Sequence, residues 1–222
     1  MGDHFQTIVD LDARAGEAPE FAARVVEWLV AEGIVLAERT DCVLGRPLGH
    51  PPGPNWRRAV GENPDLDPSD GLAVHTRRTA FDAGQGGPES VTCPRCGVTT
   101  ELAGEDYEDY EDDEDSADYE DEDEDAAGAD DRSESDEGTA DGVWDRFAAA
   151  IEVWHATGAA TVACPACAHP VPLADWTWND DCFAFGHLGF EFWNWPEFTP
   201  GFRADIARIL DGHRTAYVWG KF

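Results

Sequence analysis

Two short cysteine motifs constrain the fold of this chain more than any other feature. Cys93–Cys96 reads Cys-Pro-Arg-Cys and Cys164–Cys167 reads Cys-Pro-Ala-Cys, so each places two thiols two residues apart. One such pair forms half of a tetrahedral Zn²⁺ site, and two pairs complete a site with four thiolate ligands. We therefore predict that Cys93, Cys96, Cys164 and Cys167 bind one zinc ion and join two distant segments of the chain.

A zinc ion with four thiolate ligands has no free position for water or substrate, so we expect a structural role. A single Cys-x-x-Cys pair also occurs in redox and iron sites, but the repeated motif with proline favours zinc. The nearest alternative ligand is His169, which we expect to pack against the protein or face solvent.

Acidic residues are concentrated in one segment. The net charge of the 222 residues is −32, and residues 105–141 contain 22 Asp and Glu against one Arg. This segment therefore contributes −21 and leaves −11 on the remaining 185 residues. It cannot bury enough apolar surface to offset the entropy of ordering, so we predict a disordered acidic loop. The same negative charge disfavours direct binding to the nucleic-acid backbone.

The N-terminal part shows a strand, a helix and a second strand. Apolar residues alternate over Phe5–Leu11, which predicts a strand, and follow helical spacing over Pro19–Glu32. Gly33 is a suitable helix end. We expect a second strand to begin at Ile34–Leu36 and little regular structure in the Pro- and Gly-rich residues 45–70.

The C-terminal part shows the same order. Alternation at Leu188, Phe190 and Phe192 predicts a strand, and Thr199 followed by Pro200 predicts a capped helix start. A last strand is expected from His213 to Lys221. Between the two parts, short strands lead into each cysteine pair, and a helix is predicted from Val143 to Ala156.

Two strand–helix–strand units around an insertion predict an α+β fold. We expect a ferredoxin-like α/β sandwich with an inserted zinc ribbon and a disordered acidic loop. The predicted division is residues 1–89 and 176–222 for the two parts of the sandwich, and residues 90–175 for the zinc ribbon.

No catalytic motif is evident. Lys221 is the only lysine and is followed by the terminal Phe222, which excludes a phosphate-binding P-loop. An enzyme of unknown class can still use His187, Glu191 or the pair Asp180-Asp181, although no nucleophile motif accompanies them.

Two cysteines remain outside the motifs. Cys42 follows Asp41 and Cys182 follows Asp181. Neighbouring carboxylates disfavour a thiolate, so we expect both cysteines to be small buried hydrophobes rather than nucleophiles.

An aromatic segment, Phe192–Pro196, offers a second hypothesis for binding. Most of its rings are expected to pack in the core. The alternative is that Trp193 and Trp195 face away from the core and form a patch that binds a protein or a flat ligand.

The chain shows no signal for export or membrane insertion. Met1–Asp12 lacks the apolar segment of a signal peptide, and no uncharged run reaches membrane-spanning length. We expect a cytoplasmic protein with reduced thiols, which favours metal binding over disulfides.

The chain resembles a family of uncharacterised bacterial zinc-ribbon proteins. The residues that support the resemblance are residues 41–45, the Pro-rich residues 51–55, the two cysteine motifs and Phe185–Pro196. The resemblance implies no activity. We therefore expect a non-enzymatic zinc-binding protein whose partner is another protein. The alternative is an acidic inhibitor or immunity-type protein that neutralises a basic partner.

Overall fold

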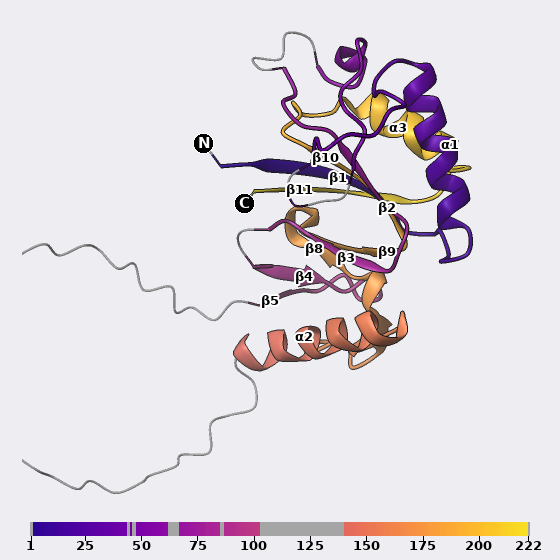
Figure 1. Cartoon of the computed structure of the whole chain (residues 1–222). Coiled ribbons are helices and arrows are strands. Elements are labelled where there is room, and N and C mark those ends of the chain that lie inside the picture. The colour runs from indigo at the N-terminus through magenta and orange to yellow at the C-terminus, as the bar shows by residue number, and fades with distance from the viewer. Residues whose placement is uncertain are drawn as a thin grey trace, which may run out of the picture.

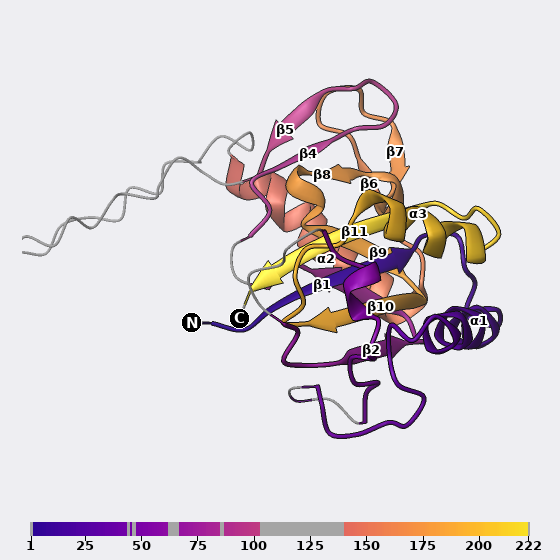
Figure 2. The same cartoon turned by 90° about the horizontal axis from the view of Figure 1, so that it is seen from above.

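A computed structural model describes residues 2–43, 45, 48–61, 67–84, 87–102 and 140–221 (Figures 1 and 2). The predicted acidic loop at residues 105–141 lies outside the described residues, except that residues 140 and 141 begin a helix. The described chain contains both helices and antiparallel sheets, so the predicted α+β class is confirmed. None of the helices in the described ranges is long and apolar enough to span a membrane.

The main sheet has four strands in the order β11-β1-β10-β2, and all neighbours are antiparallel. The strands are β1 (His4–Asp10), β2 (Leu72–His75), β10 (Leu188–Trp193) and β11 (Thr215–Lys221). In this register Thr7 lies opposite both Glu191 and Val218. The strands at the two ends of the chain, β1 and β11, are therefore neighbours in one sheet, with β1 in its interior and β11 at its edge.

Two helices cover one face of this sheet (Figure 1). The first, α1 (Ala18–Ala31), ends as predicted at Gly33, whose φ is +70°. The amides of Gly33 and Ile34 bond back to the last turn, a common way of closing a helix. The second, α3 (Pro200–Ile209), starts where Thr199 Oγ1 accepts a hydrogen bond from the amide of Phe202.

The first hydrophobic core lies between these helices and the sheet. Its largest fully buried side chains include Leu29, Phe190, Phe192, Trp195 and Ile206. Burial of such side chains contributes about 1.5–3 kcal/mol each relative to exposure, so this core is a main source of stability.

A two-stranded ribbon of β3 (Thr79–Asp82) and β9 (Phe183–Gly186) packs on the opposite face of the sheet. Val9, Phe81, Ala184 and Val218 form the contact. Gly189 on β10 is required here, because a Cβ atom at this position would lie 2.4 Å from the Phe81 ring.

The cysteine motifs belong to a third part of the molecule, beyond this ribbon (Figure 1). It contains a sheet of order β5-β4-β8, a hairpin of β6 and β7, and helix α2 (Ala140–Thr157). The strands are β4 (Ser90–Thr92), β5 (Thr99–Glu101), β6 (Thr161–Ala163), β7 (Pro170–Pro172) and β8 (Thr177–Trp178). The described residues also form three short 3₁₀ helices: Trp56–Arg58, Leu173–Asp175 and Asn179–Asp181.

This part has its own core around Phe147, which packs edge-on against Trp176 and Trp178. The same core includes Trp154 and Phe185. The predicted helix is confirmed: α2 ends at Gly158, whose φ is +84°.

The predicted strand at Ile34–Leu36 is wrong. This segment makes one isolated bridge, between Val35 and Pro52. The amides of Ile34 and Val35 both bond to the carbonyl of Leu29 at the end of α1. A continuous ladder is also blocked because Pro51 and Pro52 have no amide hydrogen to donate. The strand that follows α1 in the sheet is instead β2.

Candidate metal centre

The first cysteine pair lies in the turn between β4 and β5. The amide of Gly97 donates to the carbonyl of Cys93 at 2.9 Å, and the amide of Cys93 donates to the carbonyl of Val98 at 3.0 Å. Gly97 has a φ of +70°, a conformation that glycine adopts without strain. The turn therefore brings Cys93 and Cys96 to the tip of a hairpin.

The second pair lies in an equivalent turn between β6 and β7. The amide of Ala168 donates to the carbonyl of Cys164 at 2.8 Å, and the amide of Cys164 donates to the carbonyl of His169 at 3.0 Å. Ala168 has a φ of +57°, so an alanine occupies the left-handed position that Gly97 occupies in the first turn. The sequence difference between the motifs does not change the turn.

The two hairpin tips meet. The Sγ atoms of Cys93, Cys96, Cys164 and Cys167 all lie within 4.8 Å of one another, and the Cys96–Cys164 distance is 3.8 Å. Four sulfurs about 2.3 Å from a tetrahedral zinc ion lie about 3.8 Å apart. The four cysteines can therefore hold a metal ion, and their soft donor atoms and spacing are compatible with zinc.

The surroundings of the thiols differ. Cys93 and Cys164 are buried, whereas Cys96 is exposed. Burial opposes ionisation of Cys93, but hydrogen bonds from the backbone amides of Cys96 and Arg95 lower its pKa to about 7. The amide of Val98 favours the Cys96 thiolate, but partial loss of solvent around its sulfur and the neighbouring thiols together raise its pKa to about 11. A bound cation would let all four thiols ionise, because its positive charge stabilises the four thiolates together.

His169 does not belong to the cluster. Its side chain is exposed, and its Nδ1 lies 2.9 Å from the carbonyl oxygen of Cys167. This hydrogen bond holds the ring against its own turn. The position agrees with the expectation that His169 packs against the protein or faces solvent.

The two remaining cysteines have packed, partly buried thiols. A Cβ atom added to Gly71 would lie 2.4 Å from the Cys42 sulfur, so this thiol fills the space beside the glycine. Burial, with the carboxylates of Asp180 and Asp181, raises the pKa of Cys182 to about 11. This raised pKa agrees with the low reactivity expected for the Cys182 thiol.

His187 and Glu191, two side chains that an enzyme could use, have different contacts. His187 lies in the connection between β9 and β10, near the ring of Trp154. Burial, with the nearby Arg78 guanidinium, lowers its pKa. Glu191 is buried, and its Oε2 lies 3.1 Å from Nε2 of His75.

The proposed outward aromatic patch is wrong. Trp193 and Trp195 are 4% and 1% exposed. β10 ends at Trp193, and Asn194 has a φ of +53°, so the two rings enter different clusters. Trp193 packs with Phe5, Val43 and Ala73, whereas Trp195 packs in the first core. Within the described part of the chain, Trp219 on β11 is an exposed aromatic residue, with 45% of its surface exposed, and it borders a groove with His4 and Tyr217.

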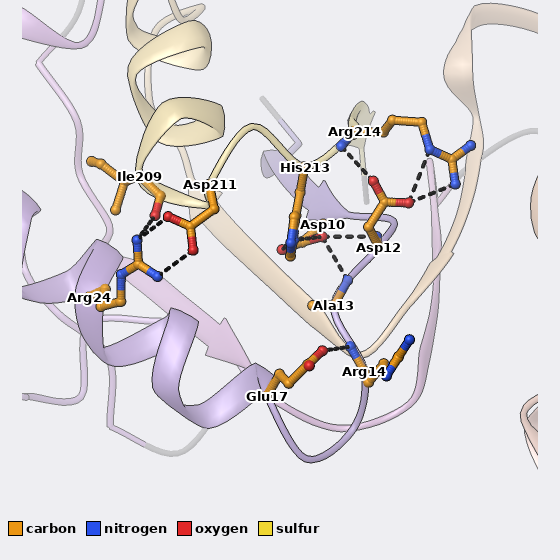
Figure 3. A network of polar contacts seen from close by, with 10 residues as sticks. All are labelled: Asp10, Asp12, Ala13, Arg14, Glu17, Arg24, Ile209, Asp211, His213 and Arg214. Carbon is orange, nitrogen blue, oxygen red and sulfur yellow. Dashed lines mark hydrogen bonds and ion pairs between the residues drawn. The ribbon is translucent and has the colours of Figure 1, made fainter.

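A polar network that the sequence did not indicate lies at one end of the main sheet (Figure 3). Asp10, at the end of β1, is fully buried and accepts hydrogen bonds from the amides of Asp12 and Ala13. His213 completes the arrangement, with its Nδ1 2.9 Å from Asp10 Oδ2. This carboxylate therefore joins the connection after β1 to the connection before β11.

Two ion pairs flank this buried contact (Figure 3). Arg214 bonds to Asp12 through its guanidinium and its backbone amide, and this contact lowers the pKa of Asp12. Arg24 on α1 bonds to Asp211 after α3. In the sequence, Asp10 and Asp12 at the end of β1 are the only sign of this network, and aspartates are also common in simple turns.

Comparisons with known proteins give no relative: no protein-family profile, curated protein or solved structure matches the chain. The class that the fold and site define is therefore an α+β protein with a four-cysteine cluster that can hold a metal ion.

Proposed function

We propose that this protein is a non-enzymatic interaction module in which a structural Zn²⁺ ion joins two cysteine-bearing hairpins. The observation that supports the proposal is the four-sulfur cluster at the hairpin tips. Four thiolates close a tetrahedral zinc site, so the ion contributes to folding and offers no position for substrate.

The zinc connects parts of the chain that otherwise share few backbone bonds. In the sheet pairing of the described residues, the β6–β7 hairpin forms a sheet of its own, separate from β4 and β5. The ion would link the two hairpins directly, on strands that share a core with Phe147 of α2. We regard this arrangement as an inserted zinc ribbon, the fold expected from the cysteine motifs.

For the remainder, we propose a ferredoxin-like sandwich. The order β11-β1-β10-β2 supports it. The two strands of the unit β1-α1-β2 lie on either side of β10, and the two strands of the unit β10-α3-β11 lie on either side of β1, as in a ferredoxin-like sheet. The three-part division of the chain stays a proposal. The second core reaches beyond residue 175 to Trp176, Trp178 and Phe185, which favours a boundary after Phe185.

A protein partner is the best match to the surface and composition. Trp219 presents an exposed ring beside Lys221 on the edge strand β11. The concentrated negative charge of residues 105–141 disfavours nucleic acid as a partner. We propose that the partner contacts the Trp219 groove, the acidic segment, or both.

The test compares partner capture by three forms of the full chain. The wild type, Trp219→Ala and a variant lacking residues 105–139 are used as baits, with zinc content measured in each. We expect one zinc per chain in all three, and a specific partner lost from at least one variant. A wild type that retains no specific partner would remove the support for an interaction module.

An acidic inhibitor or immunity-type protein is the second candidate, because 22 acidic residues fall within residues 105–141. This candidate predicts a basic partner whose binding weakens steeply with salt, since exposed charges are screened. Salt-independent binding, or equal binding by the variant without residues 105–139, contradicts it.

A further inference from the structure

The four-cysteine cluster presents one of its residues to solvent more than the others. Of the six cysteines in the chain, Cys96 is exposed, three are partly buried, and Cys93 and Cys164 are buried. The buried pair packs in the second core with Phe147 and Trp154. A reagent that approaches the cluster therefore meets Cys96 first, and exposure is one of the two properties that decide which cysteine is oxidised.

The thiol that contacts Cys96 belongs to the other hairpin. Cys96 Sγ lies 3.8 Å from Cys164 Sγ, although the two residues are 68 positions apart in the chain. Two sulfurs this close need no large movement of either hairpin to reach bonding distance. A buried thiol is therefore in place to react with an oxidised form of Cys96.

The charge of the chain limits the kind of oxidant. The net charge is −32, so the protein repels anionic oxidants such as oxidised glutathione, because like charges lower the rate of encounter. Hydrogen peroxide is small and carries no charge. It can therefore reach the exposed Cys96 without this repulsion.

We propose that Cys96 and Cys164 form a peroxide-sensitive thiol pair, in which oxidation replaces the metal link between the hairpins with a covalent one. The Cys96 thiolate attacks one oxygen of hydrogen peroxide, which gives a sulfenic acid and a hydroxide ion. The Cys164 thiolate attacks the sulfenic sulfur, which forms the S–S bond and expels a second hydroxide ion. The two sulfurs lose two electrons, the peroxide gains them, and two protons from solvent convert the hydroxide ions to water.

The effect on the metal follows from the number of ligands. Once Cys96 and Cys164 are joined, only Cys93 and Cys167 remain as thiolates, so the zinc site loses half of its ligands and releases the ion. The hairpins stay joined because the new bond connects their tips.

The release of zinc rests on the proposed function, whereas the disulfide does not require the ion. The two hairpins also share the second core, through Val91 of β4 and Val162 of β6. We therefore expect the contact between Cys96 and Cys164 to persist after chelation.

Peroxide treatment of the full chain, followed by disulfide mapping, tests the proposal. Zinc content is measured first. The chain is then treated with excess hydrogen peroxide at neutral pH, and released zinc is followed with a coloured chelator. The reaction is stopped with acid, and mass spectrometry identifies the linked peptides. We expect the loss of one zinc per chain in step with a Cys96–Cys164 disulfide, and recovery of both thiols with dithiothreitol.

Two variants identify the roles of the thiols. The double variant Cys42→Ser, Cys182→Ser keeps the four cluster cysteines and is the matched control, which should behave as the wild type does. Cys164→Ser removes the second thiol and is compared with the wild type after chelation of both. In the chelated variant, dimedone should trap the sulfenic acid of Cys96, whereas the chelated wild type should give the disulfide.

Three results would overturn the proposal. One is a main product with the disulfide inside either Cys-x-x-Cys motif, because the contact between hairpins would then not decide the pairing. Another is oxidation of Cys42 or Cys182 before Cys96. The third is a cluster that keeps its four reduced thiols in excess peroxide. A chain purified without zinc would instead contradict the proposed function, and the disulfide map would still decide the proposal.

Discussion

The two cysteine turns allow a matched pair of substitutions, Gly97→Ala in the first turn and Ala168→Gly in the second. Gly97 and Ala168 occupy equivalent positions with φ values of +70° and +57°. Both are exposed, and a Cβ atom added to Gly97 would have no neighbour within 4 Å. Substitution at either position therefore tests backbone conformation with almost no change in packing.

Two opposing effects set the size of the change in the free energy of unfolding. A side chain in the left-handed region costs about 1–2 kcal/mol, whereas alanine stabilises by about 0.4–1 kcal/mol by restricting the unfolded chain. Gly97→Ala should therefore destabilise the protein by about 1 kcal/mol, and Ala168→Gly should stabilise it by up to about 1 kcal/mol.

The assay is urea unfolding at fixed free zinc, supported by thermal melting, where about 1 kcal/mol corresponds to roughly 2–4 °C for a chain of this size. The control is Gly201→Ala in α3, where helical backbone makes the same substitution stabilising by up to about 1 kcal/mol. If Gly97→Ala also stabilises the protein, the left-handed turn geometry is wrong.

Three further predictions concern the metal ligands, the buried network and the isolated thiol. Cys96→Ser should lose most of the bound zinc, whereas Cys42→Ser should keep one ion per chain, as measured by elemental analysis. Asp10→Ala should destabilise by about 3 kcal/mol, because it leaves buried donors unsatisfied, whereas Asp205→Ala in an exposed ion pair should change urea stability by less than about 0.5 kcal/mol. Alkylation of Cys182 should be slow at pH 8 and rise until about pH 11, since its raised pKa keeps it protonated below that value; a rate that levels off near pH 9 would contradict this.

The sequence predicted the elements whose signals are local. Alternation located β1 and β10, and the Thr199-Pro200 start located α3, because each pattern reflects one buried face or one cap. The cysteine spacing located the cluster because a two-residue gap fixes the geometry of a turn.

The features that the sequence missed depend on contacts between distant segments. The strand expected at Ile34 failed because its neighbours in space are prolines from a loop. Trp193 and Trp195 are covered by segments that no pattern near them identifies. The contact of Asp10 with His213 joins opposite ends of the chain, so no spacing rule could have found it.

The zinc content of the purified protein, measured together with its accessible thiols, tests the central claim most directly. The account predicts one zinc per chain, with at most two of the six cysteines reacting before the ion is chelated and the protein unfolded, and all six afterwards. Less than half a zinc per chain, with the four cluster thiols intact and freely reactive, would contradict it.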